Sequence, residues 1–534
     1  MIQSRDLFRR ATRAVAFVVL ASGAACVRTP APATGTVPTR PTTPVFYAPR
    51  LVPQPTSLSM AGDTPFILTE RTALEAEGGD EATRVASMFA SRIRPATSFA
   101  LIVGAPAMTT NSIRFRLGAD RADLGDEGYE LVVRPDSVRI VAFRAAGLFH
   151  GAQTLRQLLP PEIESDIRIG RPWGIPSLTI RDVPRFAWRG AMLDVARHFF
   201  TVNEVEQYID ILAMYKMNRL HLHLSDDQGW RIEIKSRPLL TEKGSGMEVA
   251  GRPGGGGFYT QQEYADLVRY AEDRFITVVP EIDMPGHFNA ALIGYPEVAC
   301  SRRPPAPFLG IDVGWSTVCV DSAQSYALIN DVVRELAAIT PGPYFHMGGD
   351  EVETLTAEQY ASFVQRVQAI VALTGKTMVG WEEIGAAQLQ PGTIVQLWRA
   401  DSLRHPLAPG VKMLLSPAKK AYIDQKYDAT TELGLRWAGY VDVRDSYDWD
   451  PGTYLHGVGE DRVAGVEAPI WAETVRNISA VEYLAMPRLP AIAEVGWSAQ
   501  GSRAWNDFRD RLAAQAPRWR MLGINYFRST QIPW

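Results

Sequence analysis

The feature that most constrains the fold is a recurrence of short apolar runs after residue 185 of the 534-residue chain. Eight such runs occur, and most of them end in acidic or aromatic polar residues. They are Ala191–Arg197, Leu220–Asp227, Ile276–His287, Tyr344–Glu351, Thr377–Glu383, Thr393–Trp398, Lys412–Pro417 and Val463–Glu473. Buried parallel strands have this composition, because helices cover both faces of the sheet that they form.

Helical segments lie between several of these runs. Thr201 and Glu204 have the spacing of a capping box, with apolar residues at helical spacing behind them, and Thr260 and Glu263 repeat the pattern. Eight strands alternating with helices predict an α/β fold, a (β/α)8 barrel over residues 185–534. Because the carboxyl ends of barrel strands build the active site, we expect the polar residues there to converge on one pocket.

Residues 48–180 predict a smaller α+β domain. Tyr129–Val133 and Val138–Ala142 alternate apolar and polar residues around a Pro-Asp pair, which indicates a hairpin. Gly147–Leu159 is predicted to form a helix. No cluster of chemically reactive residues occurs in this part of the sequence, so we expect a supporting domain.

Residues 1–26 have the features of an export signal. Arginines precede Ala14–Ala25, an apolar stretch of 12 residues that is too short to span a bilayer as a helix. Cys26 stands where a lipoprotein cysteine would be, although Gly23 departs from the usual leucine. We expect a periplasmic or cell-surface protein that is lipid-anchored at Cys26, with simple secretion as the alternative. The Pro- and Thr-rich residues 27–47 predict a solvated tether.

Export also bears on the two cysteines that remain, Cys300 and Cys319. In an oxidising compartment we expect these two residues to form a disulfide, and two free thiols are the alternative. They are too few for a structural zinc site.

Composition limits the partners. The net charge of −4 favours no nucleic-acid partner, and 46% hydrophobic residues exclude a mostly disordered chain. Twelve of the 13 tryptophans lie from Trp188 onward. Flat apolar rings at this density suit sugar faces, with plain core packing as the alternative for any one of them.

Several other chemistries are disfavoured. His221 and His223 share one face of a strand and could chelate a metal, but we favour a hydrogen-bonded core and expect no metal or cofactor. The four glycines at 254–257 are not followed by Lys-Ser or Lys-Thr, so they predict a flexible loop rather than a phosphate loop. The chain has no Gly-x-Ser-x-Gly motif.

Paired carboxylates point to sugar hydrolysis. Asp350 and Glu351 follow two glycines at a predicted strand end, where little side-chain bulk obstructs a substrate. Glycoside hydrolysis needs a protonated acid at the leaving oxygen and a negative partner for the cationic transition state. Neighbours on a strand point to opposite sides, so the two carboxylates can take separate roles.

Three segments carry a specific resemblance. His346-Met347-Gly348-Gly349-Asp350-Glu351 resembles the His-x-Gly-Gly-Asp-Glu signature of glycoside hydrolase family 20, the β-N-acetylhexosaminidases. Residues 221–231 and 279–287 resemble two further segments of the family. The similarity runs from about Arg189 to the C-terminus, and Glu127-Gly128-Tyr129 and Gln153-Thr154-Leu155 resemble the N-terminal domain of the family.

The resemblance implies a catalytic set. Glu351 would be the general acid and then the base, and Asp350 would hold the 2-acetamido N–H of the substrate. Tyr422 would hydrogen-bond the acetamido oxygen, which acts as the nucleophile. Asp226 and His287 would form a supporting relay near the acid.

The resemblance also implies a binding set. Three tryptophans would wall the acetamido pocket and the sugar face: Trp381, Trp398 and Trp471. Three charged residues would bind ring hydroxyls: Arg197, Asp424 and Glu473. His346 of the signature would be a supporting residue. The implied partners are glycans ending in N-acetylhexosamine, or chitooligosaccharides.

Two alternatives remain open at this point. A retaining barrel glycosidase could use two protein carboxylates, for example Glu351 with Glu473. A sugar-binding protein without activity is the other, although the intact Asp350-Glu351 pair disfavours it.

Overall fold

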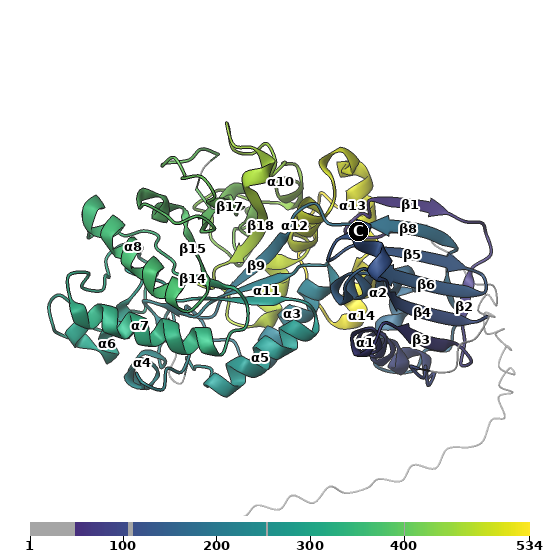
Figure 1. Ribbon diagram of the computed structural model, residues 1–534, viewed down its shortest axis with the longest axis horizontal. Helices are drawn as coiled ribbons and strands as arrows, with labels where there is room; N and C mark the ends of the chain where they lie inside the picture. Colours follow the sequence, from purple (N-terminus) through teal and green to yellow (C-terminus); the bar gives the residue numbers. More distant parts are fainter. Residues whose placement is uncertain (1–48, 105–109, 252–254, 400) are drawn as a thin grey trace, which may run out of the picture. The chain divides into compact units, whose positions relative to one another are not determined.

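The computed structural model describes residues 49–104, 110–251, 255–399 and 401–534 (Figure 1). The expected export signal at 1–26, Cys26 and the tether at 27–47 lie outside the described residues. Within the described ranges, no helix combines the length and apolarity that a membrane span requires.

A six-stranded sheet forms in the N-terminal part, in the order β1–β8–β5–β6–β4–β3. Its strands are β1 (Ser57–Met60), β3 (Ala73–Glu77), β4 (Ser112–Leu117), β5 (Tyr129–Arg134), β6 (Ser137–Ala142) and β8 (Leu178–Asp182). Helices α1 (Asp80–Thr97) and α2 (Ala145–Leu158) contact this sheet. The predicted hairpin is present, because β5 and β6 pair antiparallel.

Eight parallel strands close into a barrel, in the order β10–β13–β14–β15–β16–β17–β18–β9. They are β9 (Trp188–Asp194), β10 (Arg219–His223), β13 (Thr277–Glu281), β14 (Tyr344–His346), β15 (Thr377–Trp381), β16 (Ile394–Leu397), β17 (Lys412–Leu415) and β18 (Val463–Ile470). Each predicted apolar run overlaps one of these strands. The predicted (β/α)8 fold class is therefore confirmed.

In the described part of the chain, long helices connect the barrel strands from β9 to β15. They are α3 (Val202–Met214), α5 (Gln261–Asp273), α7 (Ala323–Ala338) and α8 (Ala357–Leu373). Both predicted capping boxes begin their helices, at Thr201 and Thr260. After β15 a 3-10 turn, Glu382–Ala386, takes the place of a helix, because the short connection runs into a Pro-Gly pair that breaks helices.

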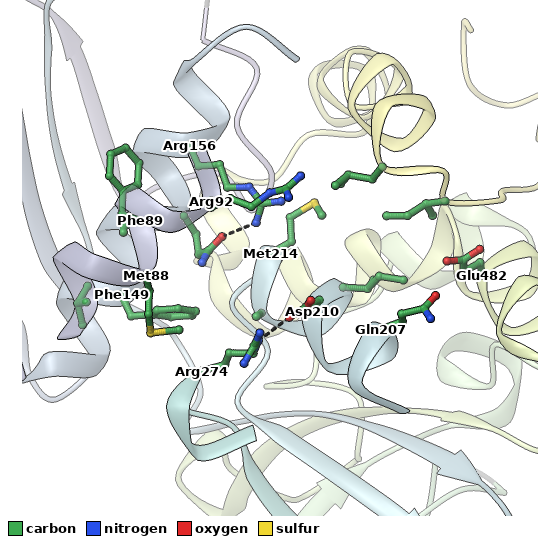
Figure 2. A pocket seen from close by; sticks show the side chains of 17 residues that line it. Met88, Phe89, Arg92, Phe149, Arg156, Gln207, Asp210, Met214, Arg274 and Glu482 are labelled. Carbon is green, nitrogen blue, oxygen red and sulfur yellow. Dashed lines mark hydrogen bonds and ion pairs between the residues drawn. The ribbon is translucent and has the colours of Figure 1, made fainter. Parts of the chain in front are cut away.

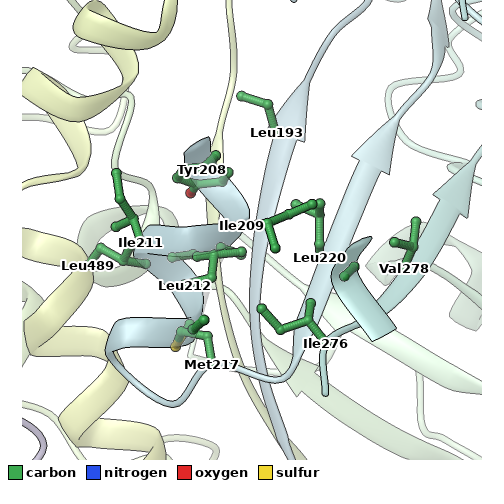
Figure 3. Close-up of a cluster of buried hydrophobic side chains, with 14 of the residues drawn as sticks. Leu193, Tyr208, Ile209, Ile211, Leu212, Met217, Leu220, Ile276, Val278 and Leu489 are labelled. Carbon is green, nitrogen blue, oxygen red and sulfur yellow. The ribbon is translucent and has the colours of Figure 1, made fainter. Parts of the chain in front are cut away.

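The outer face of the barrel strands is apolar, whereas the interior holds both apolar and charged side chains. Leu193, Leu220 and Val278 of neighbouring strands join one buried cluster with Ile209 and Leu212 of α3 (Figure 3). Burial of one such side chain stabilises the fold by about 1.5–3 kcal/mol.

The inward positions of the barrel carry charge. His221 and His223 of β10 lie there and contact Glu281 of β13, and His221 also contacts Glu467 of β18. A Cβ atom at Gly190 would lie 2.3 Å from Glu467 Oε2, so only glycine leaves room for this carboxylate. The barrel interior thus contains a packed ionic layer beneath the strand ends.

Candidate active site

The strand ends surround a pocket of about 690 Å³. Seven residues predicted for the site line it: Arg197, Asp350, Glu351, Trp398, Tyr422, Trp471 and Glu473. The other five are buried: Asp226, His287, His346, Trp381 and Asp424. The polar strand ends therefore do converge on one site.

Asp350 and Glu351 follow β14 through a strained turn. Gly348 and Gly349 have φ values of +66° and +103°, and a Cβ at Gly348 would lie 1.8 Å from Asp283 Oδ1. Glu351 itself has a φ of +52°, a left-handed conformation that costs a non-glycine residue about 1–3 kcal/mol. Strain of this kind is typical of functional sites, and here it accompanies two carboxylates at the pocket wall.

His287 lies against both carboxylates. Its Nε2 is 3.6 Å from Glu351 Oε2 and 3.9 Å from Asp350 Oδ2. Its Nδ1 is 3.2 Å from Asp226 Oδ1, and the other oxygen of Asp226 is 2.7 Å from Arg197 NH1. The structure thus places Asp226 and His287 in a row that leads to Glu351.

Burial and neighbouring charges shift the pKa values of Glu351 and His287. Burial, and then the negative charge of Asp350, raise the pKa of Glu351, while His287 and Arg197 oppose the shift. Burial disfavours the charged form of His287, but carboxylates led by Asp226 outweigh it and raise its pKa well above the usual range. Glu351 therefore keeps its proton to higher pH than an ordinary glutamate, as a general acid requires.

An aromatic cage forms the apolar side of the pocket. Trp381, Trp398, Tyr422 and Trp471 belong to one buried cluster. The Trp381 and Trp471 ring centroids are 5.7 Å apart, and Trp398 stacks with Tyr422 at 6.4 Å. Trp437, which is 54% exposed, stands edge-on to both Trp398 and Tyr422. Aromatic faces in this arrangement suit a sugar ring and an acetamido methyl group.

Asp424 and Glu473 supply acceptors. Burial, and then the charge of Glu473, raise the pKa of Asp424 to about 8. Burial raises the pKa of Glu473 to about 7 against the opposing charge of Arg197. Asp424 Oδ1 and Glu473 Oε2 are buried with no hydrogen-bond partner in the described part of the chain. Such oxygens can accept hydrogen bonds from sugar hydroxyls.

The two histidines of β10 have their ring nitrogens engaged. His221 Nδ1 is 2.9 Å from Glu467 Oε1, and its Nε2 is 3.1 Å from Glu281 Oε2. His223 Nδ1 is 2.5 Å from Glu281 Oε2, and its Nε2 is 2.9 Å from Asp226 Oδ2. These contacts are those of a hydrogen-bonded core.

His346 lies beside the aromatic cage rather than against Glu351. Its Nδ1 is 3.0 Å from Glu281 Oε1, and its ring centroid is 5.2 Å from that of Trp381. Trp381 Nε1 donates to the same oxygen of Glu281 at 2.9 Å. His346 Nδ1 also accepts a hydrogen bond from the Gly348 N–H at 3.0 Å, so this residue contacts both the cage and the turn that carries Asp350 and Glu351.

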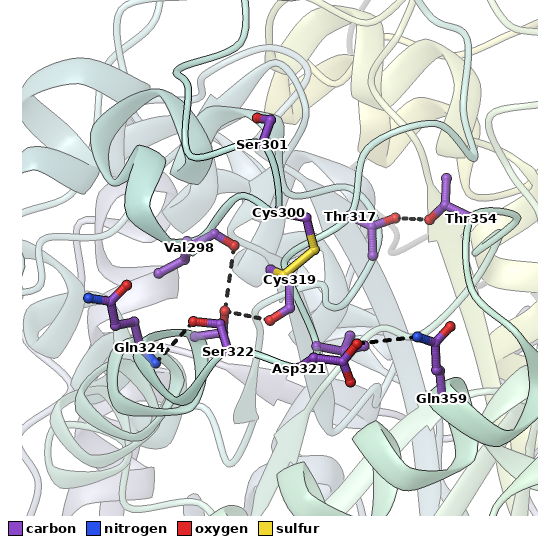
Figure 4. Close-up of a disulfide and its surroundings, with 12 residues drawn as sticks. Val298, Cys300, Ser301, Thr317, Cys319, Asp321, Ser322, Gln324, Thr354 and Gln359 are labelled. Carbon is purple, nitrogen blue, oxygen red and sulfur yellow. Dashed lines mark hydrogen bonds between the residues drawn. A yellow bond between two sulfur atoms is a disulfide. The ribbon is translucent and has the colours of Figure 1, made fainter.

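The predicted disulfide between Cys300 and Cys319 is confirmed, with the two Cα atoms 4.7 Å apart (Figure 4). The loop that it closes carries Ile311 and Val313, which line the pocket beside the carboxylates. The disulfide therefore anchors both ends of a segment of the pocket wall.

Several lining residues escaped the sequence reasoning: Ile311, Val313, Arg399, Leu435, Arg436 and Trp437. Arg399 follows the end of β16 directly after Trp398, whereas the other five lie in loops with no strand-end position and no motif that points to a pocket. The alternation of Leu309, Ile311, Val313 and Trp315 inside the cysteine loop was the only available signal. Buried Glu281 and Asp283 lie in a family-like segment, but sequence alone assigned them no role.

A second hollow, of about 250 Å³, is lined by residues of α1, α2 and α3 (Figure 2). Its cations already have anionic partners: Arg274 Nε is 2.5 Å from Asp210, and both Arg92 and Arg156 contact Glu164. None of the predicted site residues lines it. The strand-end pocket is the better candidate for chemistry.

Comparison with known proteins agrees with this assignment. The model of the glycosyl hydrolase family 20 catalytic domain matches residues 186–500, and that of family 20 domain 2 matches residues 48–183. A β-N-acetylhexosaminidase of Cellulomonas fimi is 42% identical over 493 residues, which cover 91% of this chain and 97% of the relative.

Solved structures of hexosaminidases are also similar to this chain. An N-acetyl-β-hexosaminidase of Streptomyces plicatus, in complex with Thio-NAglucal, is 48% identical with a TM-score of 0.87, covering 91% of this chain and 98% of that one. An exo β-N-acetylglucosaminidase of Vibrio harveyi, in complex with N-acetylglucosamine, is 30% identical with a TM-score of 0.79, covering 91% and 79%. The chain belongs to glycoside hydrolase family 20.

Proposed function

We propose that this chain is an exo-acting, retaining β-N-acetylhexosaminidase that removes terminal non-reducing β-GlcNAc or β-GalNAc. Its substrates are N-acetylhexosamine-terminated glycans or chitooligosaccharides, and the nucleophile is the acetamido group of the substrate. The relatives named as hexosaminidases support the reaction class.

The observation that carries the mechanism is that Asp350 and Glu351 lie on the same side. The expectation from strand alternation, that they point to opposite sides, is wrong, because both residues follow the end of β14 in a turn. Both carboxylates face His287 Nε2, at 3.9 and 3.6 Å. A retaining enzyme with a protein nucleophile needs its two carboxylates on opposite sides of the scissile bond. Glu473, the alternative partner, has its pKa raised to about 7 by burial, which does not suit a nucleophile that must be ionised.

The first half-reaction forms an oxazolinium. Glu351 donates its proton to the glycosidic oxygen as the bond to the aglycone breaks, and the acetamido oxygen bonds to the anomeric carbon. Asp350 accepts the acetamido N–H and stabilises the positive charge that develops on nitrogen. Burial and the charge of Asp424 raise the pKa of Tyr422 well above its usual range, so its hydroxyl remains a donor to the acetamido oxygen.

The second half-reaction reverses the roles. Glu351, now a carboxylate, takes a proton from water, and the water oxygen attacks the anomeric carbon while the acetamido oxygen leaves. Two inversions at one carbon give net retention. Arg197, Asp424 and Glu473 hold ring hydroxyls throughout, and fully buried Trp381 closes the aromatic end of the site, which suits removal of a terminal sugar.

The test compares kcat/KM for aryl β-GlcNAc, β-GalNAc and β-glucoside substrates, together with inhibition by an N-acetylglucosamine thiazoline. We expect activity on the two acetamido sugars, almost none on the glucoside, and strong thiazoline inhibition. Efficient glucoside cleavage without thiazoline inhibition would favour the mechanism with two protein carboxylates, and no activity on any substrate would favour a binding protein.

We also propose that the protein is exported and anchored by a lipid on Cys26. The arginines before the apolar stretch and the small residues before Cys26 support this proposal, and a disulfide is expected in an oxidising compartment. Membrane fractionation of the wild type and the Cys26→Ser variant tests it. Loss of membrane association only in the variant is expected, and equal release of both would refute the anchor.

A further inference from the structure

A single buried carboxylate lies beneath both halves of the site. Glu281 is fully buried, and four ring nitrogens surround it. Its Oε2 is 2.5 Å from His223 Nδ1 and 3.1 Å from His221 Nε2, while its Oε1 is 2.9 Å from Trp381 Nε1 and 3.0 Å from His346 Nδ1. One oxygen therefore faces the row that leads to the acid, and the other faces the aromatic cage.

His223 is held between two carboxylates. Its Nδ1 faces Glu281, and its Nε2 faces Asp226 at 2.9 Å. An ionised carboxylate only accepts hydrogen bonds, so satisfying both partners requires a ring that donates from both nitrogens, which is the imidazolium. Arg197, Asp194 at the end of β9 and Asp283, which has a carboxylate oxygen within 4.8 Å of a His223 ring nitrogen, also lie near this ring. Arg197 NH1 is 3.2 Å from Nε2, and because a guanidinium only donates, that contact would need Nε2 as the acceptor. The contact of Nε2 with Asp226 Oδ2 is shorter, at 2.9 Å, and favours Nε2 as the donor.

The ionisation of the neighbours is consistent with this state. Burial disfavours a charged His223, but Glu281 and Asp226 outweigh burial and raise its pKa well above the usual range. Burial would also disfavour ionised Asp226, but Arg197 and the flanking histidines hold its pKa far below the ordinary value. Carboxylates and imidazoles thus alternate along the row.

We propose that Glu281 and His223 are positioning residues for proton transfer by Glu351. Glu281 holds His223 as a double donor, and His223 together with Arg197 fixes the carboxylate of Asp226. The fixed Asp226 then orients His287, whose Nε2 faces Glu351. In this proposal His223 orients the row and sets its charge, and no proton passes through it. This inference rests on the proposed role of Glu351 as the acid.

The geometry separates the roles of the two residues. His223 contacts the acid row and lies edge-on to Trp471, but it makes no hydrogen bond to the cage. Glu281 also accepts from the Trp381 indole, so it additionally orients the wall of the acetamido pocket. Loss of His223 should impair protonation of the leaving group, whereas loss of Glu281 should impair both protonation and acetamido binding.

The chain offers a matched control in Glu467. This residue is also a fully buried glutamate of the barrel interior, and it contacts His221, Gln396 and Trp188. Among the described residues, it has no hydrogen bond or ion pair with Asp226 or His223. Glu467→Gln is therefore the same chemical change as Glu281→Gln, in the same ionic layer, but outside the acid row.

The experiment measures kcat/KM for phenyl and 2,4-dinitrophenyl β-GlcNAc, with thermal unfolding to verify folding. His223→Gln should lose about tenfold or more on the phenyl glycoside, which needs protonation, and less than about threefold on the activated one. It should retain thiazoline affinity, whereas Glu281→Gln should lose activity on both substrates and bind thiazoline more weakly. Glu467→Gln should affect both substrates equally.

Equal losses on the two substrates in His223→Gln, or the same differential loss in Glu467→Gln, would overturn the inference. If His223→Gln does not fold, neutron diffraction of wild-type crystals near neutral pH decides: hydrogen on both ring nitrogens supports the inference, and one bare nitrogen refutes it. A wild type that is inactive, or that cleaves glucosides equally well, would instead refute the proposed function.

Discussion

Replacing Asp350 with Asn tests the substrate-assisted mechanism most directly. Asp350 is only 6% exposed, and its Oδ1 has no hydrogen-bond partner among the residues described. Asn preserves the size of the side chain but removes the negative charge. The charge matters most when the acetamido nitrogen becomes positive, so the loss should appear mainly in kcat.

The magnitude follows from burial and distance. Two unit charges about 4 Å apart interact by about 4 kcal/mol at an effective dielectric constant of about 20. His287 Nε2, 3.9 Å from Asp350 Oδ2, partly neutralises the carboxylate and lowers this figure. We therefore expect a cost of about 3–4 kcal/mol, or roughly a 10²- to 10³-fold loss in kcat.

The assay compares 4-nitrophenyl β-GlcNAc with the matching β-glucoside. The glucoside has no acetamido group for Asp350 to orient, so its residual hydrolysis should change little in Asp350→Asn. Asp424→Asn is the matched control, because Asp424 is proposed to bind a ring hydroxyl that both sugars have. The control should lose the same fraction on both substrates.

Two results would refute this reasoning. Efficient glucoside hydrolysis by the wild type would show that the acetamido group is not needed. An equal fractional loss on both substrates in Asp350→Asn would show that Asp350 acts on something other than the acetamido group.

Three further outcomes are expected. Glu351→Gln should lose roughly 10²–10⁴-fold in kcat/KM, with smaller losses for aryl glycosides that have acidic leaving groups, and equal losses across a leaving-group series would contradict its role as the acid. Replacing Cys300 and Cys319 with Ser opens a loop with a sequence separation of 19 and should lower the free energy of unfolding by about 3 kcal/mol, measured by denaturant titration; unchanged stability would contradict a structural role for the bond. The pKa of Asp424 is raised to about 8 in the folded protein, so between its unfolded pKa and about pH 8 the residue is protonated when folded but ionised when unfolded. Its contribution to the free energy of unfolding is therefore full below the unfolded pKa and is lost as the pH rises toward 8. The melting temperature of Asp424→Asn should therefore fall less than that of the wild type between about pH 5 and 8, and parallel curves would count against the raised pKa.

Much of the fold could be read from local pattern. The apolar runs identified all eight barrel strands, because parallel strands buried on both faces must be apolar almost throughout. Both capping boxes marked helix starts, since Thr and Glu three residues apart satisfy exposed backbone groups at the N-terminus of the helix. Between β15 and β16 the 3-10 turn at Glu382–Ala386 replaces the helix expected from alternating strands and helices. The short connection between these two strands explains the replacement.

Some residues of the candidate site could likewise be predicted from the sequence, and others could not. Asp350, Glu351, Trp398 and Glu473 follow strand ends, and the barrel rule alone predicts that such residues meet. Trp437 and Val313 also line the pocket, but they come from loops whose course depends on tertiary contacts and, for Val313, on a disulfide. No periodicity of the sequence reports where such loops go.

The sequence by itself determined the barrel, the strand-end carboxylates and the pair of cysteines, because each is encoded by residue type and spacing within a short segment. Only the tertiary structure decided how charge is distributed in the barrel. Glu281, His223 and Asp226 come from separate segments, and each is tolerated inside because the others satisfy its hydrogen bonds. Ionisation in a buried site depends on such neighbours in space, which the order of residues along the chain does not specify.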